Sequence, residues 1–465
     1  MWRLIYNIVL LVLSPLILAV LLAKSRCRPG LRQRLGLKDC LSGISGRTNR
    51  PDRLNRPNEP DRPDQPVIWI HAVSLGEVVA VTPLVKELHR RHPECRLVVS
   101  TVTETGREAV EQRLSGVAEH CYAPLDFPWV VSHFIERLQP CLYLFVETEL
   151  WPNLLWHLRR REVPTALVNG RLSSRSFSRQ QWAPVRSFYR TMLQTLSLCL
   201  MQSDRDVDRI VALGAEASRV RRTGNIKFDQ PIPAVTEGGT IRADLGLQHA
   251  ELLFVAGSTH PGEEEILVEC YRALVARCPS AVLLLAPRHI ERAESVEAMV
   301  RARGIAVQRR STIGQAGASG FDGARVVVLD SRGELAAMYR EAVVAFVGGT
   351  LVPIGGHNLL EPAQWGKPVL FGLYTDHCAE IADLLIQAGG GSRVLQAEDL
   401  TRQVLILFSN NEERERMGQS ARQVVAQNQG ALQRTLEAVE RLMTPKQGIS
   451  GSSLADRPLP LMAGR

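Results

Sequence analysis

The sequence contains no C-x-x-C pair, although it has nine cysteines. An odd number of cysteines without such pairs does not suit a disulfide framework or a cysteine-type zinc site. Several cysteines lie in apolar runs, such as Cys141 in C-L-Y-L-F-V and Cys199 in L-C-L-M. We therefore expect them to be small buried hydrophobic residues in a reducing compartment.

The histidines also lack the spacing of metal ligands. His71, His260, His289 and His357 are scattered, with no i, i+4 pair among them, so a structural zinc site is not expected. Zinc-finger spacing and RNA-binding aromatic signatures are absent as well, which argues against nucleic acid as a partner. The sequence thus predicts no metal and no cofactor. The net charge of +8 instead suits membrane headgroups or a phosphorylated substrate.

Charged side chains are missing from residues 4–23, which are almost entirely apolar. Twenty such residues are enough to cross a bilayer core. A basic cluster follows directly: Lys24, Arg26, Arg28, Arg32 and Arg34. Positive charge at this end of the apolar segment keeps the end on the cytoplasmic side of the membrane. A cleaved signal peptide has the opposite charge order. We therefore expect a membrane-anchor helix within residues 1–28, either spanning the membrane or lying in its interface. A chain that starts near Gln65 is expected to fold without it.

The rest of the chain predicts two globular units. Residues 43–66 are rich in Pro, Arg, Asn and Asp and predict a disordered linker or insertion, and residues 446–465 a disordered tail. An N-terminal domain is expected over residues 67–228, a linker over 229–248 and a C-terminal domain over 249–445.

Short apolar runs alternate with amphipathic stretches of helix length in both expected domains. Runs of this length between helices indicate parallel strands covered on both faces, and two such series predict two Rossmann-like domains. Ligands of such a pair are expected in the cleft at the carboxyl ends of the strands. The ten runs are 67–73, 97–102, 142–147, 165–169, 198–202, 252–257, 282–287, 326–330, 344–349 and 368–372.

Two carboxylates follow strands in the first domain. Ser74 and Glu77, in H-A-V-S-L-G-E, have the S-x-x-E spacing of a capping box, and spacing alone favours that reading. The alternative is that Glu77 is a base, kept ionised by the helix N-terminus. Glu147 ends an apolar strand in V-E-T-E-L-W-P-N. It either points into the cleft or caps the next helix, a position that Glu149 could also take.

Three further features point to phosphate chemistry. Lys227, in T-G-N-I-K-F-D, is either a surface lysine or a cation facing a phosphate. Arg288 lies just past a strand end, where it could pair with a phosphate. The stretch 348–362 holds four glycines around an expected helix start, and Asn358 and Glu361 have the spacing of an N-cap and N3 pair. The glycines exceed what capping needs, so we expect a phosphate-binding loop.

Together these strings resemble the 3-deoxy-D-manno-octulosonic acid (Kdo) transferases of lipopolysaccharide synthesis. The resemblance runs from residue 1 to about 440. It rests on H-A-V-S-L-G-E, E-T-E-L-W-P-N, N-G-R-L-S-S-R-S, G-N-I-K-F-D, S-T-H-P-G-E-E, P-R-H-I-E-R, F-V-G-G-T, G-G-H-N-L-L-E-P and Q-N-Q-G-A-L. It implies an α/β GT-B fold at the cytoplasmic face of a bacterial inner membrane. The implied donor is CMP-Kdo, and the implied acceptor is the tetraacylated lipid A precursor, lipid IVA.

Residue roles follow by the same resemblance. It implies that Glu77 is the general base of an inverting transfer and that Glu147 and Lys227 stabilise the transition state. The implied CMP-binding residues are Pro287, Arg288, Arg332, Gly333, Glu334, Leu335, Asn358, Leu359, Leu360 and Glu361. The family often has Met where this chain has Arg332, which is harmless if only backbone groups there touch the base. The insertion at 43–66 is also unusual and has no assigned role.

Two alternatives remain open at this point. The first is another two-domain transferase or an epimerase that uses a UDP-sugar. The second is a membrane-tethered binding protein without catalysis. Neither the number of Kdo residues transferred nor the oligomeric state follows from the sequence.

Overall fold

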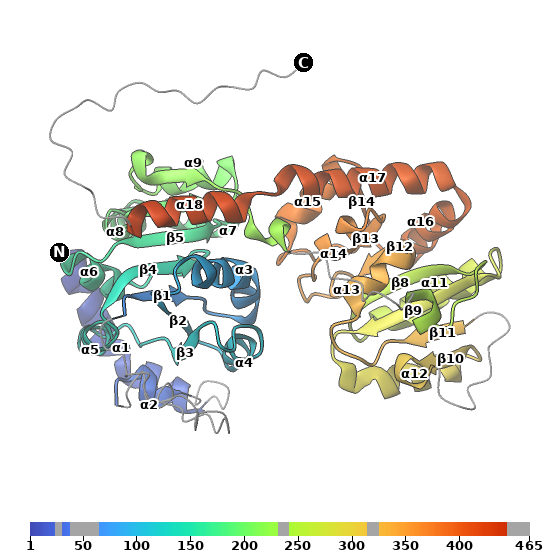
Figure 1. Cartoon of the computed structure of the whole chain (residues 1–465), viewed down its shortest axis with the longest axis horizontal. Coiled ribbons are helices and arrows are strands. Elements are labelled where there is room, and N and C mark those ends of the chain that lie inside the picture. Colours follow the sequence, from blue (N-terminus) through green and yellow to red (C-terminus); the bar gives the residue numbers. More distant parts are fainter. Residues whose placement is uncertain (24–29, 38–64, 231–240, 314–324, 444–465) are drawn as a thin grey trace, which may run out of the picture. The chain divides into compact units, whose positions relative to one another are not determined.

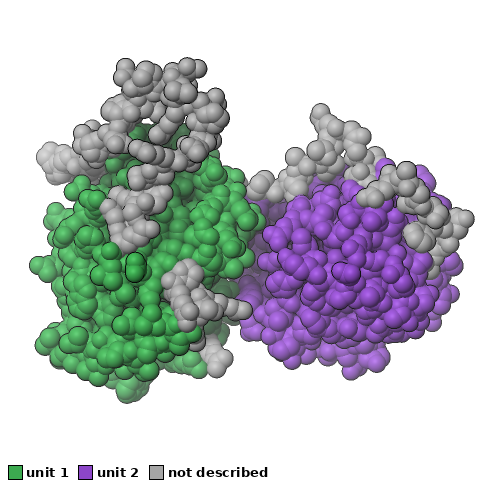
Figure 2. Space-filling view, turned by 90° about the horizontal axis from the view of Figure 1, so that it is seen from below, with its two compact units in different colours: residues 1–226, 430–465 green, residues 227–429 purple. Residues whose placement is uncertain are grey.

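A computed structural model describes residues 1–23, 30–37, 65–230, 241–313 and 325–443 (Figure 1). The expected insertion, apart from Gln65 and Pro66, and the expected C-terminal tail lie outside these residues. The chain forms two compact units (Figure 2). Unit 1 comprises residues 1–226 and 430–465, and unit 2 comprises residues 227–429.

Unit 1 contains a seven-stranded parallel sheet with the order β3-β2-β1-β4-β5-β6-β7. Its strands are β1 (Val67–His71), β2 (Arg96–Thr101), β3 (Glu119–Tyr122), β4 (Pro140–Val146), β5 (Thr165–Gly170), β6 (Leu198–Met201) and β7 (Val220–Arg222). Its helices are α1 (Trp2–Ala23), α2 (Leu31–Arg34), α3 (Leu75–Arg91), α4 (Glu104–Arg113), α5 (Pro128–Leu138), α6 (Pro152–Arg160), α7 (Ser174–Gln180), α8 (Ala183–Leu193), α9 (Asp204–Ala212) and α18 (Ala431–Met443), with a 3₁₀ turn at Ala217–Arg219.

Unit 2 contains a second seven-stranded parallel sheet, with the order β10-β11-β9-β8-β12-β13-β14. Its strands are β8 (Leu252–Thr259), β9 (Ala281–Pro287), β10 (Ala306–Arg309), β11 (Arg325–Val328), β12 (Ala342–Val347), β13 (Val369–Phe371) and β14 (Gly391–Arg393). Its helices are α10 (Ile241–Asp244), α11 (Glu263–Val275), α12 (Ala293–Ala302), α13 (Leu335–Met338), α14 (Leu360–Gln364), α15 (Ala379–Gln387), α16 (Ala397–Ser409) and α17 (Asn411–Asn428). Short 3₁₀ turns lie at Ile226–Asp229, Ile290–Arg292, Arg310–Thr312 and Tyr339–Glu341.

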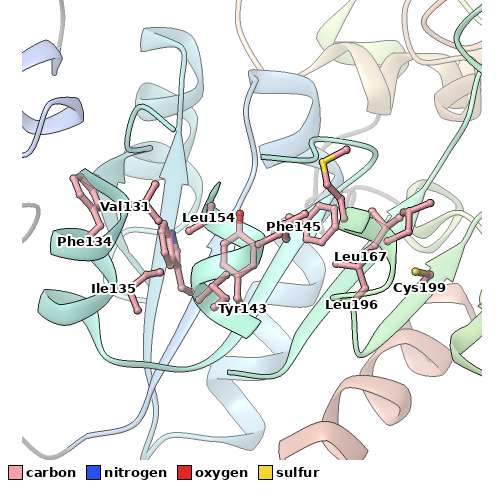
Figure 3. Packing of buried hydrophobic residues seen from close by; sticks show 14 of the residues in the cluster. Val131, Phe134, Ile135, Tyr143, Phe145, Leu154, Leu167, Leu196 and Cys199 are labelled. Atoms are coloured by element: carbon pink, nitrogen blue, oxygen red, sulfur yellow. The ribbon is translucent and has the colours of Figure 1, made fainter. Parts of the chain in front are cut away.

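The first sheet is covered on both faces because alternate residues of its strands point in opposite directions. In β1, Val67 and Trp69 pack into one apolar cluster, whereas Ile68 and Ile70 pack into the other. Figure 3 shows part of the first cluster, in which side chains of β4 and α5 meet. Two-sided burial requires continuous apolar runs, and the two predicted Rossmann-like domains are confirmed.

The units differ from the expected domain boundaries at two places. Helix α18 belongs to unit 1 rather than to the domain expected over 249–445. Its apolar side chains complete the cluster on the α3 face of the first sheet. Helix α10 lies inside the expected linker 229–248 but packs Ile241 and Leu245 into the core of unit 2.

The cysteines follow the expectation with one exception. Cys95, Cys121, Cys199, Cys270 and Cys378 are buried free thiols, and Cys278 is half-buried. The prediction was wrong for Cys141, which is exposed because β4 turns this side chain out of the sheet near its beginning. Cys27 and Cys40 lie outside the described residues.

Candidate functional site

The residues singled out in unit 1 gather where its strand order reverses, between β1 and β4. Ligands of open α/β sheets bind at the carboxyl ends of strands at such a point. Glu77 lies in the first turn of α3, directly after β1, and its side chain is buried, with 8% of its surface exposed. Its Oε2 accepts the backbone N–H of Val73 at 2.9 Å, and its Oε1 accepts the hydroxyl of Ser74 at 3.1 Å.

This arrangement is not the predicted capping box. Ser74 is the N-cap residue of α3, but its side chain accepts no backbone N–H. In a capping box it would accept the N–H of Glu77, whereas here its hydroxyl donates to the Glu77 carboxylate. Ser74 therefore orients the carboxylate of Glu77 instead of capping the helix.

Burial raises the pKa of Glu77 from 4.5 to about 7. The neighbouring Glu147 and Glu149 contribute to the rise, and the hydrogen bonds from Val73 and Ser74 oppose it. The expectation that the helix N-terminus keeps Glu77 ionised at neutral pH was wrong, because loss of solvent outweighs that stabilisation and leaves the carboxylate about half protonated at pH 7. A carboxylate with a pKa near neutrality is suited to take up and release a proton.

Glu147 directly follows β4 and has a left-handed backbone, with φ of 57°. A non-glycine residue in this region is uncommon and marks a constrained turn. The N–H of Glu147 donates to the carbonyl of Val168 in β5 at 3.1 Å. Glu147 does not cap the next helix, because α6 begins at Pro152 and has Trp151 as its N-cap residue.

The helix α6 is instead capped from a distant part of the chain. The buried carboxylate of Asp126 accepts the backbone N–H groups of Asn153 and Leu154, both at 2.9 Å. Sequence reasoning missed this contact because 26 positions separate Asp126 from Pro152. The turn that carries Glu147 and Glu149 is thus fixed at its far end as well.

A buried amide network lies just before Lys227. Asn169, another left-handed residue with φ of 53°, accepts the N–H of Ile226 on its Oδ1 at 3.0 Å. Gln202 donates to the carbonyl of Asn169 at 2.9 Å and accepts from Asn225 at 3.0 Å. Lys227 itself is half-buried and opens unit 2. The network therefore fixes the backbone that leads into Lys227.

His71, at the end of β1, is a further residue that sequence reasoning did not assign to this site. It is buried, and its Nδ1 lies 2.9 Å from the hydroxyl of Ser100. Its Nε2 has no hydrogen-bond partner among the described residues. Burial lowers the pKa of His71 to about 4, so the ring is neutral at pH 7.

In unit 2, the glycine-rich stretch after β12 binds a carboxylate of its own chain. Glu263 is fully buried and accepts four backbone N–H groups. The donors are His260 and Gly349 on Oε2, at 2.9 and 2.7 Å, and Thr350 and Leu351 on Oε1, at 3.0 and 2.9 Å.

These amides are already occupied, so the prediction that this part of the glycine-rich stretch binds phosphate was wrong. Glu263 provides the negative charge that the glycines were expected to bind from a ligand. The N–H groups of Gly355 and Gly356 donate to the carbonyl of Gly349, at 3.1 and 2.8 Å. The loop is therefore a rigid support rather than an open cradle.

Histidines that are far apart in the sequence meet beside this loop. Nε2 of His260 and Nε2 of His357 are 2.8 Å apart, and the ring of His289 lies 6.0 Å from that of His260. Burial, followed by the neighbouring His260 and Arg288, lowers the pKa of His357 to about 4. Sequence reasoning treated these histidines as scattered, because the sequence does not give the order β9-β8-β12 that makes the ends of these strands neighbours.

Arg288 is exposed at the end of β9, directly after the buried Pro287. Its N–H donates to the carbonyl of Thr259 at the end of β8, at 3.0 Å. The charge of Arg288 contributes to the lowered pKa of His357, so the guanidinium acts on the same part of the site, where it can meet an anion.

The two remaining segments that the resemblance assigns to CMP binding are both held by contacts within the chain. In the first, Arg332 pairs with Glu291 at 3.2 Å and both side chains are exposed, so the backbone of Gly333, at φ of 85°, carries the turn. Glu334 is the N-cap residue of α13, which begins at Leu335, and it accepts from Arg310 at 3.5 Å.

In the second segment, the N-cap residue of the five-residue α14 is Leu359 and not Asn358 as predicted. Asn358 accepts the N–H of Leu360 at 3.1 Å and donates to Glu361 at 3.2 Å. It also donates to Gln230 at 3.5 Å. The segment from Asn358 to Glu361 is therefore held by its own side chains.

Within the described part of the chain, no three His, Cys, Asp or Glu side chains are grouped so that they could hold a metal ion. Three aspartates alternate at the start of α9, Asp204, Asp206 and Asp208, and the second of them has a structural role. Asp206 is buried and accepts the N–H of Leu172 at 2.8 Å, and the N-cap residue Ser203 accepts the N–H of Asp206.

Known proteins resemble the chain over most of its length. Residues 48–230 match the family described as 3-deoxy-D-manno-octulosonic-acid transferase (kdotransferase). A 3-deoxy-D-manno-octulosonic acid transferase of Haemophilus influenzae is 37% identical over 445 residues, which cover 95% of this chain and 98% of that protein. The enzyme of the same name from Bordetella pertussis is 35% identical over 390 residues, 80% of this chain and 86% of the relative.

Among solved structures, the UDP-GlcNAc 2-epimerase of Neisseria meningitidis, bound to UDP-GlcNAc, aligns with a TM-score of 0.56. The alignment covers 81% of this chain and 100% of that structure, at 13% sequence identity. Identity this low shows a shared fold of two Rossmann-like units and nothing about the substrate.

Proposed function

The chain belongs to the Kdo transferase family, and from this premise we propose how its two units carry out the transfer. It is a glycosyltransferase. The donor that we propose is CMP-Kdo, and the acceptor is the lipid A precursor, lipid IVA. Membership of this family, together with a carboxylate of pKa near 7 at the switch point of unit 1, supports the proposal.

Glu77 is the general base in this proposal. A sugar hydroxyl is a poor nucleophile until a base removes its proton. The acceptor hydroxyl gives its proton to the Glu77 carboxylate as its oxygen bonds to the anomeric carbon of Kdo. The bond from that carbon to the CMP phosphate breaks, and CMP leaves with the electron pair. Attack opposite the leaving group inverts the anomeric configuration.

The remaining residues stabilise charge. Lys227 and Glu147 act on the transition state, in the roles that the family resemblance gives them. Arg288 pairs with the phosphate of CMP, whose negative charge grows as it leaves. The loop Arg332–Leu335 holds the cytosine ring of CMP through backbone groups. The salt bridge of Arg332 to the exposed Glu291 supports this assignment, because it directs that side chain to solvent.

The segment Asn358–Glu361, with Leu359 and Leu360 between them, completes the donor site in this proposal. The hydrogen bonds among its side chains fix the backbone before CMP arrives, which lowers the entropic cost of binding.

The proposed place of action is the cytoplasmic face of a bacterial inner membrane. Helix α1 has 22 residues, and an 18-residue window within it has a mean hydropathy of 2.6, so by length and composition it could cross a membrane. Its apolar surface and the basic residues that follow it suit attachment to anionic lipid. The acceptor is itself a lipid, which places the reaction at the same surface.

A transfer assay tests the proposal. Purified enzyme is mixed with CMP-Kdo and lipid IVA, and CMP release and product mass are followed together. The expected product is heavier by a whole number of Kdo residues, with one CMP released for each. Glu77→Gln should lower turnover by roughly 10²–10⁴-fold with unchanged CMP affinity in calorimetry.

Glu87→Gln is the matched control, because Glu87 lies on the same helix and is bound to Arg90 and Arg91 at the surface. It should turn over normally. Near-normal turnover by Glu77→Gln would show that Glu77 is a structural residue and not the general base. Product formation from a UDP-sugar would overturn the assignment of CMP-Kdo as the donor.

A further inference from the structure

One side of α1 lies against unit 1 along almost the whole helix. Eight residues are half-buried at helical spacing and form one stripe, whereas the rest of the helix is exposed. This stripe, hereafter the docked face, consists of Trp2, Arg3, Tyr6, Asn7, Leu10, Ser14, Ile17 and Leu21. A helix that leaves a domain to cross a membrane contacts that domain only at its end. Here the contacts reach from Trp2 to Leu21.

Polar side chains fix the first two turns of the docked face. The hydroxyl of Tyr6 donates to Oδ2 of Asp126 at 2.9 Å. Asn7 and Asn153 bind each other in both directions, at 3.1 and 2.8 Å. Asp126 and Asn153 are buried; Asn153 lies in the first turn of α6, and the carboxylate of Asp126 caps this turn. A buried carboxylate that loses a donor is strongly penalised, so these contacts are specific.

Two further hydrogen bonds and several aromatic contacts extend the docked face. Trp2 donates to Ser187 at 3.0 Å, and the guanidinium of Arg3 lies 2.9 Å from Nε2 of His157. The ring of Tyr6 stacks on Phe188 with centroids 5.8 Å apart. Leu10 and Leu21 pack against the apolar cluster shown in part in Figure 3. Figure 1 shows α1 beside α6.

The opposite side of α1, hereafter the lipid face, is apolar, uncharged and exposed. Between 40% and 71% of each of its large side chains is accessible. They are Leu4, Ile5, Ile8, Val9, Leu11, Val12, Leu13, Leu16, Leu18, Val20 and Leu22. An apolar surface of this extent is not left in water. The basic residues that follow it, such as the exposed Arg32, favour anionic lipid as its partner over a protein surface.

We propose that α1 lies in the plane of the membrane as part of unit 1 and does not cross the bilayer. This inference deepens the proposed membrane attachment and rests on it. At about 1.5 Å per residue the helix is long enough to span. A crossing would, however, draw Asp126, His157 and the charged surface around them into hydrocarbon, which is prohibitively costly. When α1 instead lies in the plane of the membrane, only its lipid face enters the hydrocarbon.

The arrangement gives α1 a second role. Asn153 and Asp126 hold the start of α6, and the turn from Glu147 leads directly into it. The helix that contacts lipid thus also supports the turn that carries a catalytic carboxylate. These contacts argue against the expectation that a chain starting near Gln65 folds independently, since Asp126, Asn153 and His157 would each lose a hydrogen-bond partner in α1.

Protease protection tests the membrane arrangement in the full chain. A cleavable epitope is added before Met1 and, in a second version, after Arg465, and both are expressed in spheroplasts. Both epitopes should resist external protease until the membrane is permeabilised. Cleavage of the N-terminal epitope alone in intact spheroplasts would show a crossing helix and overturn the inference. An untagged protein that does not sediment with membranes would overturn the attachment itself.

Three variants separate the two faces. Val12→Asp, on the lipid face, should reduce sedimentation with phosphatidylethanolamine–phosphatidylglycerol vesicles at least about 10-fold without changing Tm or CMP affinity. Tyr6→Phe, on the docked face, should keep vesicle binding but lower Tm by about 3–10 °C, because Asp126 loses a donor. Asn7→Ala should behave like Tyr6→Phe. Unchanged Tm in both docked-face variants would mean that α1 is not part of unit 1.

Discussion

Replacing Glu77 by Gln should stabilise unit 1 above neutral pH while it abolishes most transfer. Burial holds the pKa of Glu77 at about 7 instead of 4.5. One pKa unit corresponds to about 1.4 kcal/mol, so ionised Glu77 destabilises the folded state by about 3 kcal/mol. Gln avoids this cost. The side-chain carbonyl of Gln can accept the N–H of Val73, and the hydroxyl of Ser74 can rotate to accept a hydrogen bond from the side-chain NH₂ group. The loss in hydrogen-bond energy is therefore about 1 kcal/mol.

The pH dependence follows from the direction of the shift. Between pH 4.5 and about 7 the folded state keeps a proton on Glu77 that the unfolded chain has released. Stability therefore falls as pH rises through this window. The free-energy advantage of Glu77→Gln should grow by about 2.5 kcal/mol between pH 5 and pH 8.

Urea unfolding at each pH measures this difference, followed by tryptophan fluorescence, to which the fully buried Trp69 of unit 1 contributes. Glu87→Gln is the control, because hydrogen bonds from Arg90 and Arg91 lower the pKa of Glu87 to about 2. The contribution of Glu87 to the free energy of unfolding changes mainly below about pH 5. The difference in stability between Glu87→Gln and the wild type should therefore be nearly constant from pH 5 to 8. A Glu77→Gln curve that runs parallel to the wild type over that range would refute the assignment of a raised pKa.

Three further predictions concern the other groups. Arg288→Ala should weaken CMP binding about 10-fold or more in calorimetry, whereas Arg332→Ala, whose partner is exposed, should change it less than about 2-fold. Glu263→Gln should lower Tm by roughly 10 °C, since an amide cannot accept four backbone N–H groups; Glu265→Gln on the same helix turn should lower it by less than about 3 °C. Asn169→Ala should slow transfer without changing CMP affinity. An equal loss of transfer and of CMP affinity would show that the buried amide network supports folding in general and does not specifically position the backbone before Lys227.

The apolar runs predicted the strands at the centre of each sheet and missed those at the edges. All ten expected runs are strands in the structure. The four missed strands, β3, β7, β10 and β14, are the outermost ones of the two sheets. Their sequences are E-H-C-Y, V-R-R, A-V-Q-R and G-S-R. An edge strand needs little apolar surface, so a rule based on two-sided burial cannot find it.

Local motifs placed the candidate residues but not their partners. The position of Glu77 after β1 followed from the sequence, yet its raised pKa depends on burial and on Glu147 and Glu149. The carboxylate of Glu263 meets backbone N–H groups 86 to 88 positions later. Such pairs depend on which strands are neighbours in the sheet, and a short stretch of sequence does not determine the strand order.

The return of α18 to unit 1 has a consequence for how the protein is made. A ribosome completes residues 227–429 before it reaches Ala431, so unit 2 has its whole core while unit 1 still lacks Leu436 and Val439. The unit that begins first is finished last, although domains usually fold in the order of synthesis. Until then one face of the first sheet stays partly uncovered, although α1 was synthesised long before. A nascent chain that stops before Ala431 would therefore carry its defect in the N-terminal unit, far in sequence from the missing residues.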